Sequence, residues 1–284
     1  MTLYYESSDG TIIDFMSGGI YAQEPETLTE SEWNYTTISG ANGISKIKRF
    51  YKNAKAYNLT LDIMSDTREE FDELMANMHA VFDRDVQAIK PGRIWWNNYY
   101  KEVFVISMTN TEFDELFESV TRKLTILSLY PYWIKTNTYQ FMKLSSEVGK
   151  LDYGMEGFYD GFDYGGYDYG RSENIERIPV KVIKTANFEL IFYGPASQPS
   201  VTIGDHRYGL DIRLAAGEYA TINSISKKIK KYDKYGREEN VFYARDRDSY
   251  IFEKLPAGSL PILRQKDLSF DVTVYDERGE PEWI

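Results

Sequence analysis

The chain has 284 residues, and its composition, 42% hydrophobic with 24 Tyr and no Cys, is typical of a folded, strand-rich protein of two domains. Its 44 acidic and 33 basic side chains give a formal net charge of −11, which repels nucleic acid and anionic membrane and argues against both as partners. Without Cys there is no disulfide framework and no thiolate nucleophile, which suits assembly in a reducing cytoplasm, and the first residues lack the pattern of a secretory signal.

The N-terminal half predicts several strands and one principal helix. Before Arg49 the sequence is less regular, and its Gly, Ser and Asn content predicts short strands with long turns. Residues 57–63 alternate between apolar and polar side chains, which predicts a half-buried strand. Residues 66–84 carry apolar side chains at helical spacing behind Asp66 and Glu69, and this pattern predicts an amphipathic helix with an acidic outer face.

Aromatic side chains are concentrated in the segment that follows the helix. The turn signal Pro91-Gly92 leads into two aromatic runs separated by Asn97-Asn98, which predicts a hairpin over residues 93–106. A second alternating segment begins near Val120 and ends at Tyr130-Pro131-Tyr132-Trp133. We therefore expect an α+β N-terminal domain.

Residues 143–178 interrupt the strand pattern. Asp-Tyr-Gly occurs three times between residues 151 and 170, and the glycines lower the local stiffness, so we predict an interdomain connector or extended loop. Its tyrosines and phenylalanines offer large amphipathic surfaces, so a docking role on a neighbouring subunit stands beside the passive one.

From residue 179 to 284 the signals are almost wholly those of strands. Short apolar runs separated by Gly and Pro turns at intervals of about 8–12 residues predict an antiparallel β-sandwich or jelly roll. The lysine-rich run from Lys227 to Lys234 is the best candidate for a local basic patch, and a solvated strand edge or turn is its simpler interpretation.

Enzymatic chemistry finds little support in the sequence. The two histidines, His79 and His206, lie far apart, so no histidine-based metal site is predicted, and no phosphate loop, dinucleotide fingerprint or nucleophile elbow is present. A glycosidase needs only two carboxylates, and with 44 acidic residues such pairs arise by chance. We predict no catalytic, cofactor-binding or metal-binding residues and no enzymatic activity.

Several short motifs resemble, in their order, the distal tail proteins of siphophages. They are LYPYW at 129–133, FYGP at 192–195, FEKLPAG at 252–258 and ERGEPEW at 277–283. The resemblance implies an N-terminal ring-forming domain, 1–142, and a C-terminal galectin-like sandwich, 179–284, joined by residues 143–178. It also implies a six-membered ring around a channel that continues the tail tube.

The resemblance further implies a set of partners at the tail tip of a virion. They are further copies of the chain, the tail tube protein, a hub or fibre protein, and receptor-binding or other baseplate proteins. A closed ring needs two different complementary patches on each subunit, and the aromatic hairpin is our candidate for one of them, although its side chains are equally suited to the core. The candidate subunit-interface residues are Trp95, Trp96, Tyr99 and Tyr100.

One function of a different class remains open. The C-terminal sandwich has Tyr and Trp side chains on predicted loops, and aromatic faces stack on sugar rings, so it could instead be a carbohydrate-binding module that attaches the particle to glycans of the host cell wall.

Overall fold

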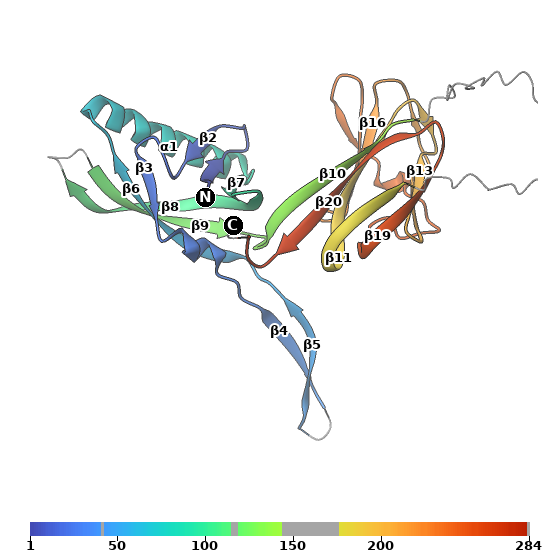
Figure 1. The fold of residues 1–284 in the computed structure, drawn as a ribbon, viewed down its shortest axis with the longest axis horizontal. Helices are drawn as coiled ribbons and strands as arrows, with labels where there is room; N and C mark the ends of the chain where they lie inside the picture. The colour runs from blue at the N-terminus through green and yellow to red at the C-terminus, as the bar shows by residue number, and fades with distance from the viewer. Residues whose placement is uncertain (41–42, 115–118, 144–175, 283–284) are drawn as a thin grey trace, which may run out of the picture. The chain divides into compact units, whose positions relative to one another are not determined.

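The computed structural model describes residues 1–40, 43–114, 119–143 and 176–282, and these residues form a mainly antiparallel β protein with one long helix (Figure 1). The predicted fold class is confirmed. The chain divides into two compact units, residues 1–135 together with 277–284, and residues 136–276. The predicted domain limits, 1–142, 143–178 and 179–284, stay a prediction. By their contacts, residues 136–141 belong to the second unit and residues 277–282 to the first. The Asp-Tyr-Gly run lies outside the described residues.

The first unit contains two sheets that share one long strand, β8, and a separate two-stranded hairpin of β4 and β5. Its strands are β1 Leu3–Glu6, β2 Ile12–Asp14, β3 Ile20–Gln23, β4 Asn34–Ser39, β5 Ser45–Tyr51, β6 Lys55–Met64, β7 Gly92–Trp96, β8 Tyr99–Asp114 and β9 Ser119–Ser128, with a short 3-10 helix, η1, at Pro25–Thr29. The first part of β8 pairs with β7 in the order β2-β1-β7-β8, and its later part pairs with β9 in the order β3-β6-β9-β8. The apolar core of this unit includes side chains from both sheets.

Helix α1, Arg68–Ala88, closes the first unit against its sheets. Its N-cap is Thr67, whose hydroxyl accepts a hydrogen bond from the Glu70 backbone N–H at 3.3 Å, so the predicted cap at Asp66 is one residue early. Apolar side chains at helical spacing face inward, and Phe82 meets the ring of Tyr5 edge-on at 4.9 Å. The helix runs four residues beyond the predicted end, because buried Asp85 lies in its last turn.

The C-cap of α1 is a strained position. Ile89 has φ 53° and is 82% exposed, a left-handed conformation that a β-branched residue adopts at a cost and that Gly adopts freely. We expect Ile89→Gly to raise the free energy of unfolding by about 1 kcal/mol. The denaturant midpoint of Trp fluorescence measures this change. Ile89→Ala is the control that keeps a Cβ, and an equal gain in both variants would contradict the argument.

The second unit is a β-sandwich with a 3-10 turn, η2, at Phe242–Ala244. Its strands are β10 Trp133–Phe141, β11 Arg177–Tyr193, β12 Ala196–Ser197, β13 Ser200–Ile203, β14 His206–Gly209, β15 Arg213–Leu214, β16 Tyr219–Asn223, β17 Lys228–Tyr232, β18 Glu238–Asn240, β19 Leu255–Arg264 and β20 Ser269–Arg278. Strand β11 pairs with β19 along its first half and with β16 and β20 along its second half. It therefore joins the two layers.

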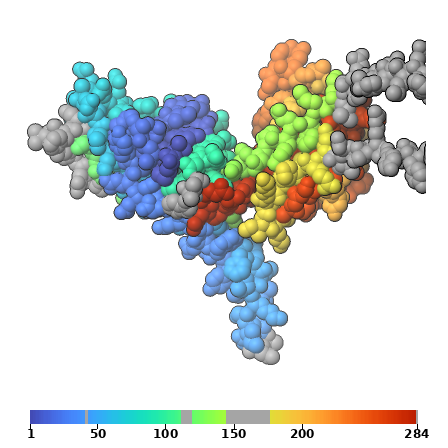
Figure 2. Space-filling model, viewed as in Figure 1, coloured from blue at the N-terminus to red at the C-terminus, as the bar shows by residue number. Residues whose placement is uncertain are grey.

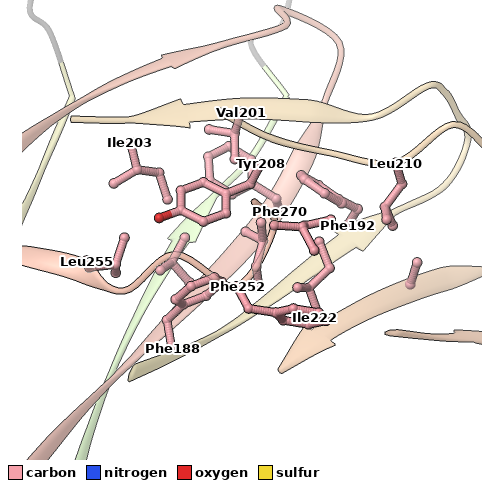
Figure 3. Packing of buried hydrophobic residues seen from close by; sticks show 14 of the residues in the cluster. Phe188, Phe192, Val201, Ile203, Tyr208, Leu210, Ile222, Phe252, Leu255 and Phe270 are labelled. Carbon is pink, nitrogen blue, oxygen red and sulfur yellow. The ribbon is translucent and has the colours of Figure 1, made fainter. Parts of the chain in front are cut away.

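An aromatic core fills the second unit (Figure 3). Phe188 meets Tyr208 edge-on at 4.9 Å, and the Tyr208 hydroxyl donates to the Glu253 carbonyl oxygen at 2.8 Å. Phe270 stacks on Phe141 of β10 at 4.7 Å. The hydrogen bond satisfies the polar end of Tyr208, so the ring is buried without an orphaned hydroxyl.

The lysine-rich run was predicted as a strand edge or turn, and the structure corrects half of that prediction. Lys227 lies in a turn with φ 53°, but β17 pairs with β16 on one side and β18 on the other, so it is an interior strand. Lys230 and Lys231 reach Glu238 and Glu218 at 2.7 and 2.8 Å. These acidic partners balance part of the positive charge of the run.

Candidate functional site

The predicted hairpin exists, but most of its aromatic side chains point inward. β7 and β8 pair from Trp96↔Tyr99 outward around Asn97, which has φ 51°. Trp96 and Tyr99 are each 1% exposed, and Trp96 packs edge-on against Trp133 at 6.2 Å. Tyr100 is also buried. These three side chains stabilise the first unit itself.

Trp95 is the one member of the predicted interface set that keeps part of its surface exposed. Its ring lies 5.9 Å from that of Tyr4 in a stacked arrangement, and its indole N–H donates to Glu6 Oε2 at 2.6 Å. The side chain is therefore held rigidly at the surface. A role for Trp95 in contacts between subunits stays a prediction.

A larger apolar surface lies on β4 and β5, which we call the arm (residues 34–51). The two strands pair only with each other, and they extend away from the rest of the first unit (Figures 1 and 2). Large apolar side chains along the arm are between 55% and 69% exposed. They are Tyr35, Ile38, Ile44, Ile47 and Phe50.

The arm cannot be explained by the stability of a single chain. A two-stranded hairpin by itself is marginal in water, and a group of large exposed apolar side chains of this kind indicates an interaction site. Tyr35 and Phe50 face each other across the strands at 6.5 Å, which stiffens the hairpin but leaves both rings open to solvent. We therefore take the arm as the candidate functional site.

The arm and its root are basic, although the protein as a whole is acidic. Between residues 33 and 61 the sequence contains no Asp or Glu. The basic side chains of this stretch are Lys46, Lys48, Arg49, Lys52 and Lys55. The combination of exposed apolar and basic side chains predicts a partner surface that is apolar and acidic.

Aromatic packing fixes the root of the arm. Trp33, next to β4, meets Tyr132 edge-on at 6.5 Å, and the Lys52 ammonium lies between them, 5.2 Å from the Trp33 ring and 4.6 Å from the Tyr132 ring. Tyr130 donates to Glu277 Oε1 at 2.8 Å. The aromatic motif at 129–133 thus packs against the root of the arm through Tyr132.

The first unit also has an open acidic hollow, with a volume of about 970 Å³, beside the start of α1. Asp66, Glu70 and Glu73 supply its charge, and among the described residues no basic side chain lines it. Tyr21 and Met64 are 44% and 45% exposed there. The hollow therefore combines exposed apolar side chains with negative charge.

Glycine at position 19 is required for the shape of this hollow. Gly19 has φ 84°, and a Cβ added to it would lie 2.4 Å from the Met64 carbonyl oxygen. Its own carbonyl oxygen accepts a hydrogen bond from the Met64 N–H at 2.8 Å. Only Gly allows the turn before β3 to approach the end of β6 this closely.

Two of the buried ionisable groups of the first unit are Asp85 and Lys101. Asp85 is fully buried and accepts hydrogen bonds from Tyr5, Ser7 and Ser8 at 2.5–3.0 Å. Burial raises the pKa of Asp85, but these hydrogen bonds outweigh it and lower the pKa below its ordinary value. Lys101, 2% exposed, donates to the Leu28 carbonyl oxygen at 2.7 Å. Both groups bond to the protein's own atoms, as structural groups do.

The second unit has a smaller polar hollow of about 440 Å³. Exposed Tyr243 lines it together with Arg207, Asp211 and Asp246. An aromatic face beside charged groups is the arrangement that the sugar-binding alternative needs, and that alternative stays a prediction.

The histidines are not brought together. The His79 ring lies 2.9 Å from the Arg122 guanidinium, and the His206 ring lies 3.0 Å from the Tyr250 carbonyl oxygen. Within the described residues, no group of three or more His, Asp or Glu side chains is placed to hold a metal ion. No helix of the described chain is long and apolar enough to cross a membrane.

Comparison with known proteins identifies the class of fold. No protein-family model matches the sequence, and no curated protein matches it either. The fold, however, is that of phage tail-hub and baseplate proteins. It is similar to the Dit protein of phage SPP1, described as a paradigm of the hub adsorption apparatus in phages that infect Gram-positive bacteria, with a TM-score of 0.58 and 9% identity over 97% of this chain and 98% of that one.

Chains of the phage P2 baseplate in its activated conformation show the same fold. The structure with Ca gives a TM-score of 0.58 and 16% identity over 96% of this chain and 98% of that chain. The structure with Sr gives a TM-score of 0.59 and 15% identity over 96% of this chain and 97% of that chain. Both units are therefore matched, and the resemblance drawn from the sequence motifs is confirmed at the level of the fold.

Proposed function

We propose that this protein is a structural component of a phage tail tip, a distal tail protein whose copies form a ring between the tail tube and the host-adsorption apparatus. The observation that carries the proposal is the likeness of fold, over nearly the full length of both chains, to the SPP1 Dit protein and to phage P2 baseplate chains. Likeness over both units supports a shared architecture of the whole chain. Fold alone does not fix function, so the exposed arm is the second support.

The arm supports the proposal because it needs a partner that the single chain does not supply. Its exposed apolar side chains lose their contact with water only when another surface covers them. A ring of copies, six in the proposal, provides such a surface at every position of the ring, whereas a soluble monomer leaves it open. The tail tube protein, a hub or fibre protein and the receptor-binding proteins are the further partners that we propose.

The proposal assigns no reaction to the chain. The buried carboxylate, Asp85, and the buried amine, Lys101, are held by hydrogen bonds inside the first unit and face no cavity among those described above. Binding and assembly are functions that an exposed arm performs without a reaction centre.

Measurement of the mass of the purified full chain in solution tests the proposal. We expect an assembly of six copies by native mass spectrometry and annular particles by negative-stain electron microscopy. A monomer at every concentration tested, with no ring in the images, would contradict a self-assembling tail-tip component.

A further inference from the structure

We infer that the arm of one copy inserts into the acidic hollow of the next copy, so that the two surfaces form one repeated contact. The inference rests on the proposed function, because it identifies the surfaces through which the copies join. Both surfaces belong to the first unit, so the geometry of each is fixed within one compact body.

The arm does not fill the hollow of its own chain. β4 and β5 leave the first unit in a direction away from α1, whose first turns line the hollow (Figure 1). At the arm root Trp33 and Lys52 contact the ring of Tyr132, and none of the described residues that line the hollow belongs to the arm. The contact must therefore join two copies.

The charges of the two surfaces are opposite. Lys46, Lys48 and Arg49 lie on β5, and the hollow is lined by Asp66, Glu70 and Glu73. In a chain of net charge −11, two copies repel each other on average, so an attractive contact requires the basic region of one to meet an acidic region of the other. The arm and the hollow are such a pair.

Both surfaces also carry exposed apolar side chains, which can pack against each other. Ile47 and Phe50 project from the arm with more than half of each side chain exposed, and Tyr21 and Met64 are half-exposed in the hollow. Clefts of roughly 300–1,000 Å³ bury most of a drug-sized ligand, so the hollow has room for a few large side chains of a hairpin. Apolar contact supplies affinity, and charge selects the partner.

Arm and hollow are different patches on one chain, so their contact is head-to-tail. Each copy offers an arm to one neighbour and a hollow to the other, and such a contact closes into a ring when the rotation between copies closes. A two-fold dimer, in which the same patch meets itself, does not use the two surfaces in this way.

Charge reversal on the full chain tests the contact directly. We expect Lys46→Glu with Lys48→Glu, and separately Glu70→Lys with Glu73→Lys, each to weaken self-association about a hundredfold or more, since like charges then meet. Combining all four changes in one chain should restore assembly. The matched controls, Lys227→Glu with Lys254→Glu and Asp83→Lys with Asp267→Lys, change charge by the same amount at exposed positions elsewhere and should assemble like the wild type.

A crosslinking experiment provides a second measurement. Because the chain has no Cys, Ile47→Cys on the arm and Glu73→Cys in the hollow can be oxidised without a background. The double variant should give a ladder of covalent oligomers on a non-reducing gel, and each single variant should give dimers at most. The inference is wrong if the wild type and the charge-reversal variants all assemble and the double cysteine variant gives no ladder. The proposed function is unaffected by that outcome. A wild type that never assembles overturns both.

Discussion

Asp85→Ala is expected to lower the free energy of unfolding of the first unit by about 3 kcal/mol at pH 7, because hydrogen bonds to a buried charged group are the strong ones and their loss leaves buried donors without an acceptor. The carboxylate joins the last turn of α1 to β1 and the turn after it through Tyr5, Ser7 and Ser8. Its removal separates the helix from the strand that it packs on.

Trp fluorescence reports the first unit selectively in this measurement. The five Trp residues are at 33, 95, 96, 133 and 283, and the second unit, 136–276, contains none. Asp83→Ala, an exposed neighbour on the same helix, is the control and should shift the denaturant midpoint little. An equal shift for both variants would count against a special role for Asp85.

Substitution of Gly92 tests the same hydrogen bonds independently. A Cβ at this position would lie 2.2 Å from the Tyr5 hydroxyl oxygen and 2.8 Å from Asp85 Oδ2. Gly92→Ala should therefore displace the hydroxyl from the carboxylate and reproduce part of the loss seen with Asp85→Ala. If the two losses add in full in the double variant, the two residues do not act through one contact.

The pH dependence of this stabilisation has a definite sign. The pKa of Asp85 is lower in the folded state than its ordinary value of 3.8, so the folded state favours the charged carboxylate. The stabilisation is complete above that ordinary value and is lost as the pH falls through the lower folded value. The difference in stability between the wild type and Asp85→Asn should accordingly shrink in acid.

Regular elements were predictable from the sequence, because each buries one face. The alternation at residues 57–63 gives β6, and the helical spacing after residue 66 gives α1. Asn97-Asn98 gives the turn between β7 and β8. In each case the apolar pattern and the local turn chemistry indicate the same structure, so the reading from sequence was correct.

The candidate site was not predicted, because an arm that buries neither face has no alternating pattern. Ile38, Ile47 and Phe50 read as core residues in isolation, and only the structure shows them exposed. One local signal was available. Asn42-Gly43, between two runs rich in Tyr, Thr and Ile, is a strong hairpin signal.

The aromatic hairpin left two interpretations open from sequence, a subunit interface and the core, for a related reason. Trp96 and Tyr99 are amphipathic residues that occur both at interfaces and in cores, and sequence spacing does not distinguish the two environments. The hollow has no sequence signature, since its walls come from residues 18–21 and 64–77, which only the pairing of β3 with β6 brings together.

Lys101 should make the stability of the first unit rise with pH between neutral and mildly alkaline solution. Burial, together with the nearby charges of Lys52 and Lys55, lowers the pKa of Lys101 to about 6. The unfolded chain keeps the ordinary value of 10.5, so between the two values the unfolded state binds a proton that the folded state lacks. Stability then increases by about 1.4 kcal/mol per pH unit, or about 2.7 kcal/mol from pH 7 to 9.

Lys101→Met removes the titrating group and should give a nearly flat profile over the same range, whereas the exposed Lys90→Met should keep the slope. The range from pH 7 to 9 suits the comparison because carboxylates are already ionised and most tyrosines are still neutral. Two ring faces oppose the effect of burial, since the Lys101 ammonium lies 3.9 Å from the Tyr57 ring and 4.5 Å from the Trp133 ring, and such faces favour a cation. A wild-type profile as flat as that of Lys101→Met would mean that these rings keep the buried amine charged, against our expectation.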